Sequence, residues 1–428
     1  MPCRLFAPRG LLLGLIVLAG AAAVYKISLR TPPALFRPPT IATTNSPAAM
    51  TTSFASRAQN IATHAASLIE LKDGSVRAFW FAGSREGAQD VEIRSAVFDG
   101  QQWSNERSII DRERTQQALL RYVKKLGNPV AVRAPDGAIR LYYVTVSLGG
   151  WAGSSLTTMT SRDEGETWSA PRRLVTSPFL NISTLIKGTP FDYSDGTIGL
   201  PVYHEFLGKF GELLHLSAGG DVLDKQRLSA GKAGIQPVML IEDPKRALVL
   251  MRYTGAPPMR VIATQTKDGG QTWSSPTRTD LPNPDAALTG VVLNDDRMLV
   301  VLNDIEQGRD VLSLLASGDG GKTWQKVYRL EDQRGQSTVP GDFLRNTAQL
   351  ALGTDTRITD TNAYARSAQR NRCEADHCGY EFSYPYLLQT RNGDFHLVYT
   401  WNRSFIKHVQ FNRAWLDARM KESDAALH

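Results

Sequence analysis

Short runs of alternating hydrophobic and polar residues recur along most of the chain. They are rich in β-branched and aromatic residues, as at 77–81 (RAFWF) and 141–146 (LYYVTV), which is typical of β-strands. Sustained helical periodicity occurs only near the N-terminus and in the C-terminal tail. Turn-forming pairs split six such regions, at Asp73-Gly74, Asp136-Gly137, Asp195-Gly196, Asp243-Pro244, Asn294-Asp295 and Asn392-Gly393. The pattern predicts six β-hairpins and an all-β fold.

A second motif repeats in phase with the hairpins. It reads Ser/Thr-x-Asp-x-Gly-x-Thr-Trp, and we call it the Asp box. The aspartate can accept hydrogen bonds from the backbone of a turn, the glycine permits positive φ, and the tryptophan can close the base of the hairpin. We therefore assign a structural role to three pairs, Asp163 and Trp168, Asp268 and Trp273, and Asp319 and Trp324.

The spacing of these motifs predicts the architecture. With looser copies at 98–103 and 217–221, the Asp boxes recur at intervals of about 50 to 60 residues, which indicates propeller blades. We expect a six-bladed β-propeller over 51–415, followed by a polar tail at 416–428. The polar, Arg-rich stretch at 332–379 lengthens the last interval, so we expect it to be an insertion in a rim loop.

An apolar run at 10–24, flanked by basic residues, predicts that residues 1–30 are an export segment. The run is about 15 residues long, against roughly 20 for a spanning helix, and Ala21-Ala22-Ala23 offers a cleavage site. The apolar residues Tyr25 and Ile27 and a Pro-rich linker at 31–50 favour an uncleaved anchor. Both alternatives place the propeller outside the cytoplasm, on the membrane if the segment is kept and secreted if it is cleaved.

Composition narrows the function classes. The 428 residues are 42% hydrophobic and 21% charged, with a formal net charge of +7. The basic residues are scattered rather than gathered in a stripe, which argues against nucleic acid binding, while the positive surplus suits an acidic glycan. The sequence contains no Gly-rich phosphate loop, CxxC pair or HExxH motif, so we expect no cofactor. We also expect a monomer.

Two of the three cysteines lie close together in the insertion. Cys3 falls in the export segment, whereas Cys373 and Cys378 enclose four residues. An oxidising compartment favours a disulfide between these two. The alternative is a metal site that uses His377 and both thiols, but the sequence offers no second ligand cluster for it.

The upstream ends of the inner strands are where we expect a ligand to bind, because they converge on the axis of a propeller. His64 opens the first of these strands. A proline there can simply end a loop before a strand, but a repeat in phase favours a shared pocket. Four ends carry a residue before proline, at Asn128-Pro129, Gln236-Pro237, Asn283-Pro284 and Tyr384-Pro385.

The Asp boxes, the hairpin period and the order of arginines resemble the sialidase (neuraminidase) superfamily, in a divergent branch with BNR (Asp-box) repeats. The resemblance covers about 55–412. Asp boxes also occur in non-enzymatic propellers, so they identify an architecture and not a reaction. The resemblance implies three arginines on the substrate carboxylate, a tyrosine nucleophile paired with a glutamate, and an aspartate acid/base.

Four matches to that pattern carry specific roles. In the loop at 83–90, the resemblance implies that Asp90 is the acid/base and that Arg85 contacts the sugar. Arg252 and Arg309 match the second and third arginines of the triad, and Tyr384 matches the nucleophile.

Two positions depart from the pattern. His64 stands where the first triad arginine is expected, and Gln236 stands where the activating glutamate is expected. Glutamine cannot take the tyrosine proton, so retaining chemistry needs a substitute base. His64 itself can donate to a carboxylate or act as an acid/base near neutral pH. The candidate substitute bases are Glu86, Glu205 and Glu381, and the other residues expected to face an anionic ligand are Arg403, Lys407, Asn128 and Asn283.

Three functions fit these residues. The first is an exo-acting glycoside hydrolase on a sialic acid or related acidic sugar. The second is a polysaccharide lyase or uronate-directed enzyme that uses His64 and Tyr384. The third is a glycan-binding propeller without catalysis. The enzymatic alternatives require Asp90, Arg252, Arg309 and Tyr384 to meet around one axis.

Overall fold

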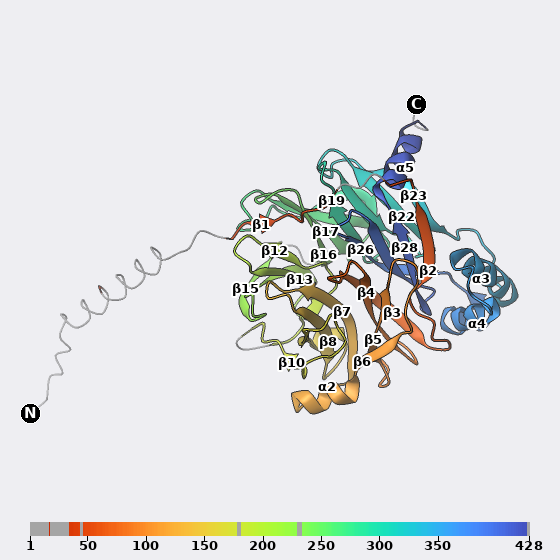
Figure 1. The fold of residues 1–428 in the computed structure, drawn as a ribbon, viewed down its shortest axis with the longest axis horizontal. Coiled ribbons are helices and arrows are strands. Elements are labelled where there is room, and N and C mark those ends of the chain that lie inside the picture. Colours follow the sequence, from red (N-terminus) through yellow and green to blue (C-terminus); the bar gives the residue numbers. More distant parts are fainter. Residues whose placement is uncertain (1–16, 18–33, 43–45, 178–180, 229–232, 426–428) are drawn as a thin grey trace, which may run out of the picture.

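The chain folds into six sheets around one axis (Figure 1). The computed structural model describes Val17 and residues 34–42, 46–177, 181–228 and 233–425. The predicted all-β, six-bladed propeller is confirmed. The predicted export segment at 1–30, with Cys3, lies outside the described residues except for Val17. Within the described ranges, no helix has both the length and the apolar character needed to cross a bilayer.

Each blade is built from strands that follow one another in the chain, the innermost first. Blade 1 holds β3 (Ala62–Glu70), β4 (Val76–Gly83), β5 (Glu92–Phe98) and β6 (Arg107–Asp111). Blade 2 holds β7 (Lys125–Arg133), β8 (Ile139–Val146), β9 (Ser154–Ser161) and β10 (Arg172–Arg173). Blade 3 holds β11 (Leu185–Ile186), β12 (Phe191–Tyr193), β13 (Ile198–His204), β14 (Phe210–Leu216) and β15 (Val222–Arg227).

The second half of the ring repeats this order. Blade 4 holds β16 (Gly234–Ile241), β17 (Ala247–Tyr253), β18 (Arg260–Thr266) and β19 (Thr277–Pro282). Blade 5 holds β20 (Thr289–Val292), β21 (Met298–Leu302), β22 (Val311–Ser317) and β23 (Gln325–Asp332). Blade 6 holds β26 (Phe382–Gln389), β27 (Phe395–Trp401), β28 (Phe405–Phe411) and, at its outer edge, β2 (Met50–Phe54).

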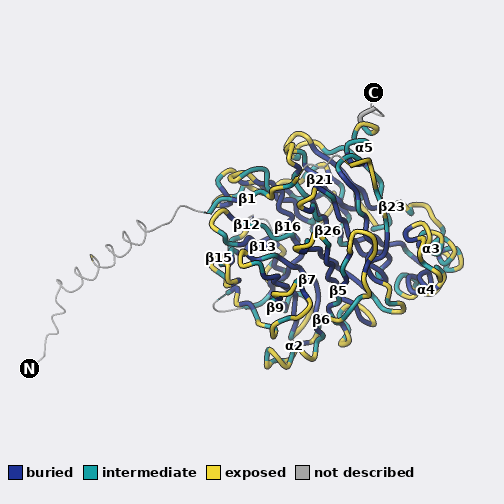
Figure 2. The backbone as a smooth tube through the Cα atoms, viewed as in Figure 1, coloured by how far each residue is buried: buried dark blue, intermediate teal, exposed yellow. Residues whose placement is uncertain are grey.

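The six predicted hairpin turns all join the two inner strands of a blade. In the first, the Leu71 amide donates to the Ser75 carbonyl at 2.8 Å, and Gly74 adopts a φ of 87°. The second strands are buried along their whole length in β4, β8, β13 and β21. Figure 2 shows the same burial through the middle of the molecule. These strands have an apolar character on both faces because a blade packs against a neighbour on each side.

The Asp boxes form the turns between the third and fourth strands of blades 2, 4 and 5. Asp163 accepts from the Thr167 amide at 2.9 Å and from its hydroxyl at 2.6 Å, and Trp168 Nε1 donates to the Gly165 carbonyl at 3.0 Å. Hydrogen bonds led by those from Thr272 and Thr323 lower the pKa of Asp268 and Asp319 to about 2. The boxes therefore stabilise turns on the outer part of these three blades.

Both ends of the chain build blade 6. The N-terminal β2 pairs with β28 from Met50 opposite Phe411 to Phe54 opposite Lys407. This pairing ties a strand that precedes blade 1 to the last strand of the chain and so closes the ring.

The Pro-rich stretch expected to be a linker is, in its described part, bound along the propeller. We call residues 34–42 and 46–49 the strap. Its β1 (Phe36–Arg37) pairs with β12. Further along, Asn294 Nδ2 donates to the Ile41 carbonyl at 3.0 Å, and the Ala42 amide donates to the Arg391 carbonyl at 2.8 Å. Phe36 fastens the strap because it is buried and stacks on Tyr193.

The insertion at 332–379 contains helices that the sequence pattern did not predict. They are α3 (Pro340–Thr354) and α4 (Thr361–Arg372), followed by a hairpin of β24 (Cys373–Glu374) and β25 (His377–Cys378). Phe343, Thr347 and Ala351 are buried at four-residue spacing, a short apolar stripe that the polar composition conceals. Three further helical elements in the described ranges are α2 (Arg112–Leu119), the short 3₁₀ turn η1 (Trp151–Gly153) and α5 (Arg413–Ala425), which begins just before the expected tail.

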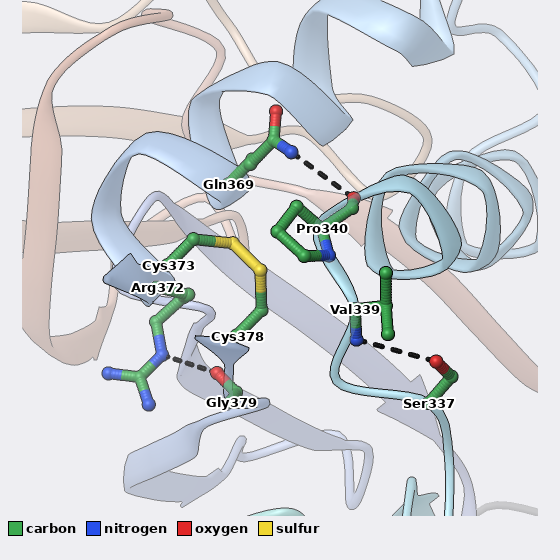
Figure 3. Close-up of a disulfide and its surroundings, with 8 residues drawn as sticks. All are labelled: Ser337, Val339, Pro340, Gln369, Arg372, Cys373, Cys378 and Gly379. Atoms are coloured by element: carbon green, nitrogen blue, oxygen red, sulfur yellow. Dashed lines mark hydrogen bonds between the residues drawn. A yellow bond between two sulfur atoms is a disulfide. The ribbon is translucent and has the colours of Figure 1, made fainter. Parts of the chain in front are cut away.

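The two cysteines of the insertion form a disulfide, as predicted (Figure 3). The alternative metal site is therefore wrong, because both thiols are bonded to each other. No group of His, Cys, Asp and Glu in the described part of the chain is arranged to hold a metal ion.

Candidate functional site

Four inner strands break register near their upstream ends, in blades 1, 2, 4 and 6. At each break one residue has a positive φ, namely Ala65, Asn128, Gln236 and Tyr384. Such a backbone costs of order 1 kcal/mol or more in a residue other than glycine, and a bulge re-aims the side chains beside it. The bulges therefore explain why strand residues point along the axis into a pocket rather than into a blade interface.

All six blades contribute to one cavity of about 280 Å³ at this end of the axis, which we call the central cavity. This volume lies just below the usual range for ligand pockets, roughly 300 to 1,000 Å³, and suits a ligand of monosaccharide size. Its lining residues are His64, Glu86, Asn128, Trp151, Tyr203, Glu205, Lys209, Ile235, Gln236, Arg252, Arg309, Tyr384 and Arg403.

Tyr384 and Gln236 are in direct contact. Gln236 Nε2 lies 3.3 Å from Tyr384 Oη and 3.3 Å from Tyr203 Oη, and Arg252 Nη1 donates to Gln236 Oε1 at 3.3 Å. Because Arg252 occupies the amide oxygen, the amide nitrogen faces both phenols and donates to them. Gln236 thus occupies the place expected for the activating glutamate, but it cannot serve as a base for Tyr384.

His64 lies against the other side of Tyr384. The two ring centroids are 4.3 Å apart, and the imidazole is buried, with Nδ1 lacking a hydrogen-bond partner. Burial lowers the pKa of His64 to about 4. The imidazole is therefore neutral near pH 7, and its Nδ1 is enclosed by protein without a hydrogen-bond partner.

A buried carboxylate, Glu381, organises three arginines beside the cavity. It accepts from Arg403 Nε at 2.8 Å and from Arg372 Nη1 at 2.8 Å, and it lies 3.5 Å from Arg309 Nη1. Burial opposes the ionisation of Glu381, but Arg403, His64, Arg372 and Arg309 outweigh it and lower its pKa to about 2. Glu381 is consequently an anchor for arginines rather than a proton acceptor.

The second triad arginine also has an acidic neighbour. Arg252 Nε donates to Asp285 Oδ1, and Arg309 Nη2 donates to the carbonyl of the same residue at 2.8 Å. Asp285 thus holds both guanidinium groups on one side of the central cavity. With Arg403 and Lys209 they outnumber Glu86 and Glu205, the two carboxylates that line the cavity, so the lining favours an anion, while Asp285 and Glu381 behind it offset part of the positive charge.

The two lining carboxylates differ in environment. Glu205 is half-buried, and burial raises its pKa above the ordinary value. Glu86 is more open, and its Oε2 accepts from Arg403 Nη1 at 3.3 Å. A pair of carboxyl groups in different environments is suited to acid and base roles.

Asp90, the predicted acid/base, lies outside the central cavity. Its carboxylate is exposed and accepts from the Ser84 amide and hydroxyl, each at 2.9 Å, so it closes its own loop. Asp90 and Arg85 line a separate surface cavity with Tyr122. The expectation that Asp90 joins Arg252, Arg309 and Tyr384 is therefore wrong for Asp90, and Glu86 is the residue of this loop that reaches the central cavity.

Two other residues expected to face a ligand are internal. Lys407, in β28, is buried and donates to Glu331 Oε1 at 2.6 Å. Asn283 is fully buried, and its Oδ1 accepts from the Ala286 amide at 3.1 Å. Lys407 lies on the third strand of its blade, away from the axis, and Asn283 shapes a turn. Asn128 and Arg403 do line the central cavity.

Trp151 is a lining residue that the sequence analysis missed, since its Gly-rich loop offered no pattern. Lys125 Nζ lies 3.7 Å from the centroid of the indole. A Cβ on Gly127 would lie 2.6 Å from Trp151 Cη2, so the indole depends on a glycine at that position. A glycine directly before Asn128-Pro129 is the available signal for an aromatic residue packed on the strand.

Lys187 lies behind Tyr384 and is also unpredicted. It is buried, donates to the Pro385 carbonyl at 3.0 Å, and lies 5.9 Å from the centroid of the Tyr384 ring. Burial lowers its pKa to about 7. Tyr384 thus has a partly protonated amine behind it and the arginine-lined cavity in front.

Comparison with known proteins gives a family and a fold. A family model described as a BNR repeat-like domain matches residues 74–397. No curated protein sequence matches the chain. Among solved structures, the Hadza microbial sialidase is 17% identical with a TM-score of 0.59, and the match covers 82% of this chain and 66% of that one.

Two further solved structures show the same fold over nearly their whole length. An intramolecular trans-sialidase from Ruminococcus gnavus, in complex with oseltamivir carboxylate, is 12% identical with a TM-score of 0.56, and the match covers 83% of this chain and 95% of that one. A protein of unknown function from Dyadobacter fermentans is 12% identical with a TM-score of 0.61, with coverages of 85% and 98%. At these identities the likeness concerns the fold.

Proposed function

Because the chain belongs to the family of BNR repeat-like domains, within the sialidase superfamily, we propose that it is an exo-acting glycoside hydrolase on a sialic acid or a related acidic sugar. The observation that carries this proposal is the central cavity. It is of monosaccharide size and is lined by Arg252, Arg309 and Arg403 beside the phenol of Tyr384. Guanidinium groups bind a carboxylate bidentately, and a neutral phenol avoids repelling an anionic sugar.

The two lining carboxyl groups supply the proton transfers. Glu205, whose pKa is raised by burial, donates its proton to the leaving oxygen as the glycosidic bond breaks. A water molecule forms the new bond to the anomeric carbon and gives its proton to Glu86, whose carboxylate accepts a hydrogen bond from Arg403. Tyr384, which accepts from Gln236, places phenol oxygen electron density near the developing positive charge.

Release of 4-methylumbelliferone from its sialic acid glycoside tests this proposal. We expect turnover by the full chain, a loss of at least about a hundredfold in Glu205→Gln and Tyr384→Phe, and little change in Asp90→Asn. Asp90→Asn is the matched control, because Asp90 lies outside the central cavity. If Asp90→Asn abolishes turnover and Glu205→Gln does not, the assignment of roles is wrong. Absence of turnover by the full chain, with tight binding of the sugar, leaves the glycan-binding alternative.

A lyase is a second candidate because of the contact between His64 and Tyr384. The neutral imidazole can take a proton next to a carboxylate that the arginines neutralise, while the phenol protonates the leaving oxygen. The product is unsaturated and absorbs in the ultraviolet. On a uronate-containing polysaccharide, appearance of this absorbance and its loss in His64→Ala identify the lyase, whereas new reducing ends without absorbance identify the hydrolase.

The same proposal includes a location. The expected export segment at 1–30 and the disulfide between Cys373 and Cys378 both favour an oxidising compartment outside the cytoplasm. We infer that the substrates are extracytoplasmic glycans and that the N-terminal segment tethers the enzyme to the membrane. Fractionation of cells that express the full chain, with and without residues 1–30, checks this location.

A further inference from the structure

A second cavity of about 670 Å³ adjoins the central cavity, and we call it the side cavity. It lies where blade 5, the upstream end of blade 6 and the insertion meet. Its walls include Arg309 and Asp310 of blade 5, Gln336 and Thr338 of the segment after β23, and Arg372 and His377 of the insertion.

Arg309 lines both cavities. Its backbone is fixed at the boundary because the Phe382 amide donates to the Arg309 carbonyl at 2.7 Å. Its guanidinium is held by the Asp285 carbonyl and by Glu381. Arg309 is therefore the side chain that the two cavities share, and a ligand bound in either one can contact it.

The two cavities differ in charge. In the side cavity, Glu381 lies between Arg309 and Arg372 and neutralises much of their charge, and Asp310 adds a carboxylate. The other polar groups there are the amide of Gln336, the hydroxyl of Thr338 and the imidazole of His377. Uncharged donors and acceptors of this kind suit the hydroxyl groups of a neutral sugar, whereas the central cavity suits an anion.

The wall of the side cavity is held in place by a disulfide and by hydrogen bonds. The disulfide closes the hairpin of β24 and β25, the Cys378 amide donates to the Thr338 carbonyl at 2.8 Å, and Arg372 Nε donates to the Gly379 carbonyl at 2.7 Å. Figure 3 shows the disulfide beside the start of α3, with Arg372 turned to Gly379. A fixed wall lowers the entropy cost of binding a ligand.

We propose that the side cavity is a subsite for the neutral sugar that carries the acidic terminal sugar in the substrate. This inference rests on the proposed function, because it assigns the terminal sugar to the central cavity. It adds that the enzyme selects glycans by the residue next to the acidic end, through groups of the insertion. Arg309 then contacts both sugars of the substrate.

The test compares two ligands on the full chain by titration calorimetry. The probes are the methyl glycoside of sialic acid, which fills only the central cavity, and 3′-sialyllactose, which adds a neutral disaccharide. We expect 3′-sialyllactose to bind at least about tenfold more tightly than the methyl glycoside. In the double variant Gln336→Ala/His377→Ala, the ratio of the two affinities falls close to one. Both side chains are exposed, so the fold tolerates the change.

A matched control is Gln307→Ala/Asp376→Ala, which alters exposed residues of the β21–β22 loop and of the β24–β25 hairpin that do not line the side cavity. This variant keeps the wild-type ratio. Equal affinities of the two ligands for the wild type, or the same ratio in both double variants, overturn the subsite alone. Failure of the wild type to bind either ligand overturns the proposed function and the subsite together, so the two failures are distinguishable.

Discussion

The strand residues and the loop residues around the central cavity are positioned in different ways. Asn128, Gln236 and Tyr384 come from inner strands, and each is directed to the axis by a bulge with positive φ followed by proline. The loop of blade 1 instead sends Glu86 into the cavity and turns Asp90 back onto Ser84. The strands therefore direct residues to the axis by the same backbone geometry in several blades. In a loop, local contacts determine which side chain reaches the cavity.

The largest expected effect, on the unfolding free energy, comes from removing the charge of Glu381, which pairs with three arginines from different loops and from the insertion. Glu381→Gln leaves Arg309, Arg372 and Arg403 without their shared counter-charge in a buried site. Breaking a buried ion pair costs about 3 to 5 kcal/mol of unfolding free energy. Urea denaturation measures this loss. Glu374→Gln, an exposed carboxylate of the same insertion, serves as the control and leaves the midpoint unchanged.

The next largest effect is expected from acid, which should lower the unfolding free energy through His64 of β3. The pKa of His64 is about 4 in the folded chain, below its ordinary value of 6.5, so the unfolded chain binds more protons between these values. Stability contributed by neutral His64 is present above pH 6.5 and is lost as the pH falls toward 4, at about 1.4 kcal/mol per pKa unit. Unfolding free energies measured across this window check the slope.

The variant His64→Gln isolates this contribution. The unfolding free energy of this variant should depend less steeply on pH than that of the wild type over the same window, because the contribution of His64 is absent. Some dependence should remain, because buried His396, whose pKa burial also lowers to about 4, is present in both proteins. Identical slopes in the two proteins contradict the assignment to His64.

A smaller effect is expected from opening the disulfide, which belongs to the loop side of the comparison. In the chain-entropy model, releasing so short a loop costs about 2 kcal/mol. Cys373→Ser/Cys378→Ser should therefore lower the unfolding free energy modestly. It should also weaken 3′-sialyllactose more than the methyl glycoside of sialic acid, because the hairpin forms a wall of the side cavity. Denaturation and calorimetry on the same variant measure both effects, and an equal change for both ligands contradicts the second.

The smallest expected effect comes from enlarging Gly127, a strand residue that packs against Trp151 of a loop. Gly127→Ala places a methyl group against Trp151 and displaces the indole at a cost of about 1 kcal/mol or more. Tryptophan fluorescence reports the displacement. Gly150→Ala is the control, because no atom outside its two chain neighbours lies within 4 Å of the added carbon there. Equal spectra for the two variants show that the indole does not rest on Gly127.

These differences follow from what repeats in the sequence. The hairpin turns and Asp boxes repeat, so the blade number and the strand ends that carry Gln236 and Tyr384 could be predicted. Glu86 and Asp90 stand four residues apart in one irregular loop, and what distinguishes them is their contacts, Asp90 with Ser84 and Glu86 with Arg403. Lys407 was expected to face an anionic ligand, and this was wrong because Glu331, distant in the sequence, pairs with it inside the protein. Trp151 and Lys187 belong to single, unrepeated features.

The strap gives the molecule a direction in which it resists pulling. It contacts the inner turns of blades 4 to 6, at the opposite strand ends from the central cavity, before it continues into β2. Tension applied at residue 34 first detaches Phe36 from its aromatic pocket, then the contacts of Ile41 and Ala42, and only afterwards loads the seam of blade 6. The contacts of the strap therefore break before those of blade 6. A mechanical load is dissipated at the inner turns, while the end of the axis that holds the central cavity keeps its shape.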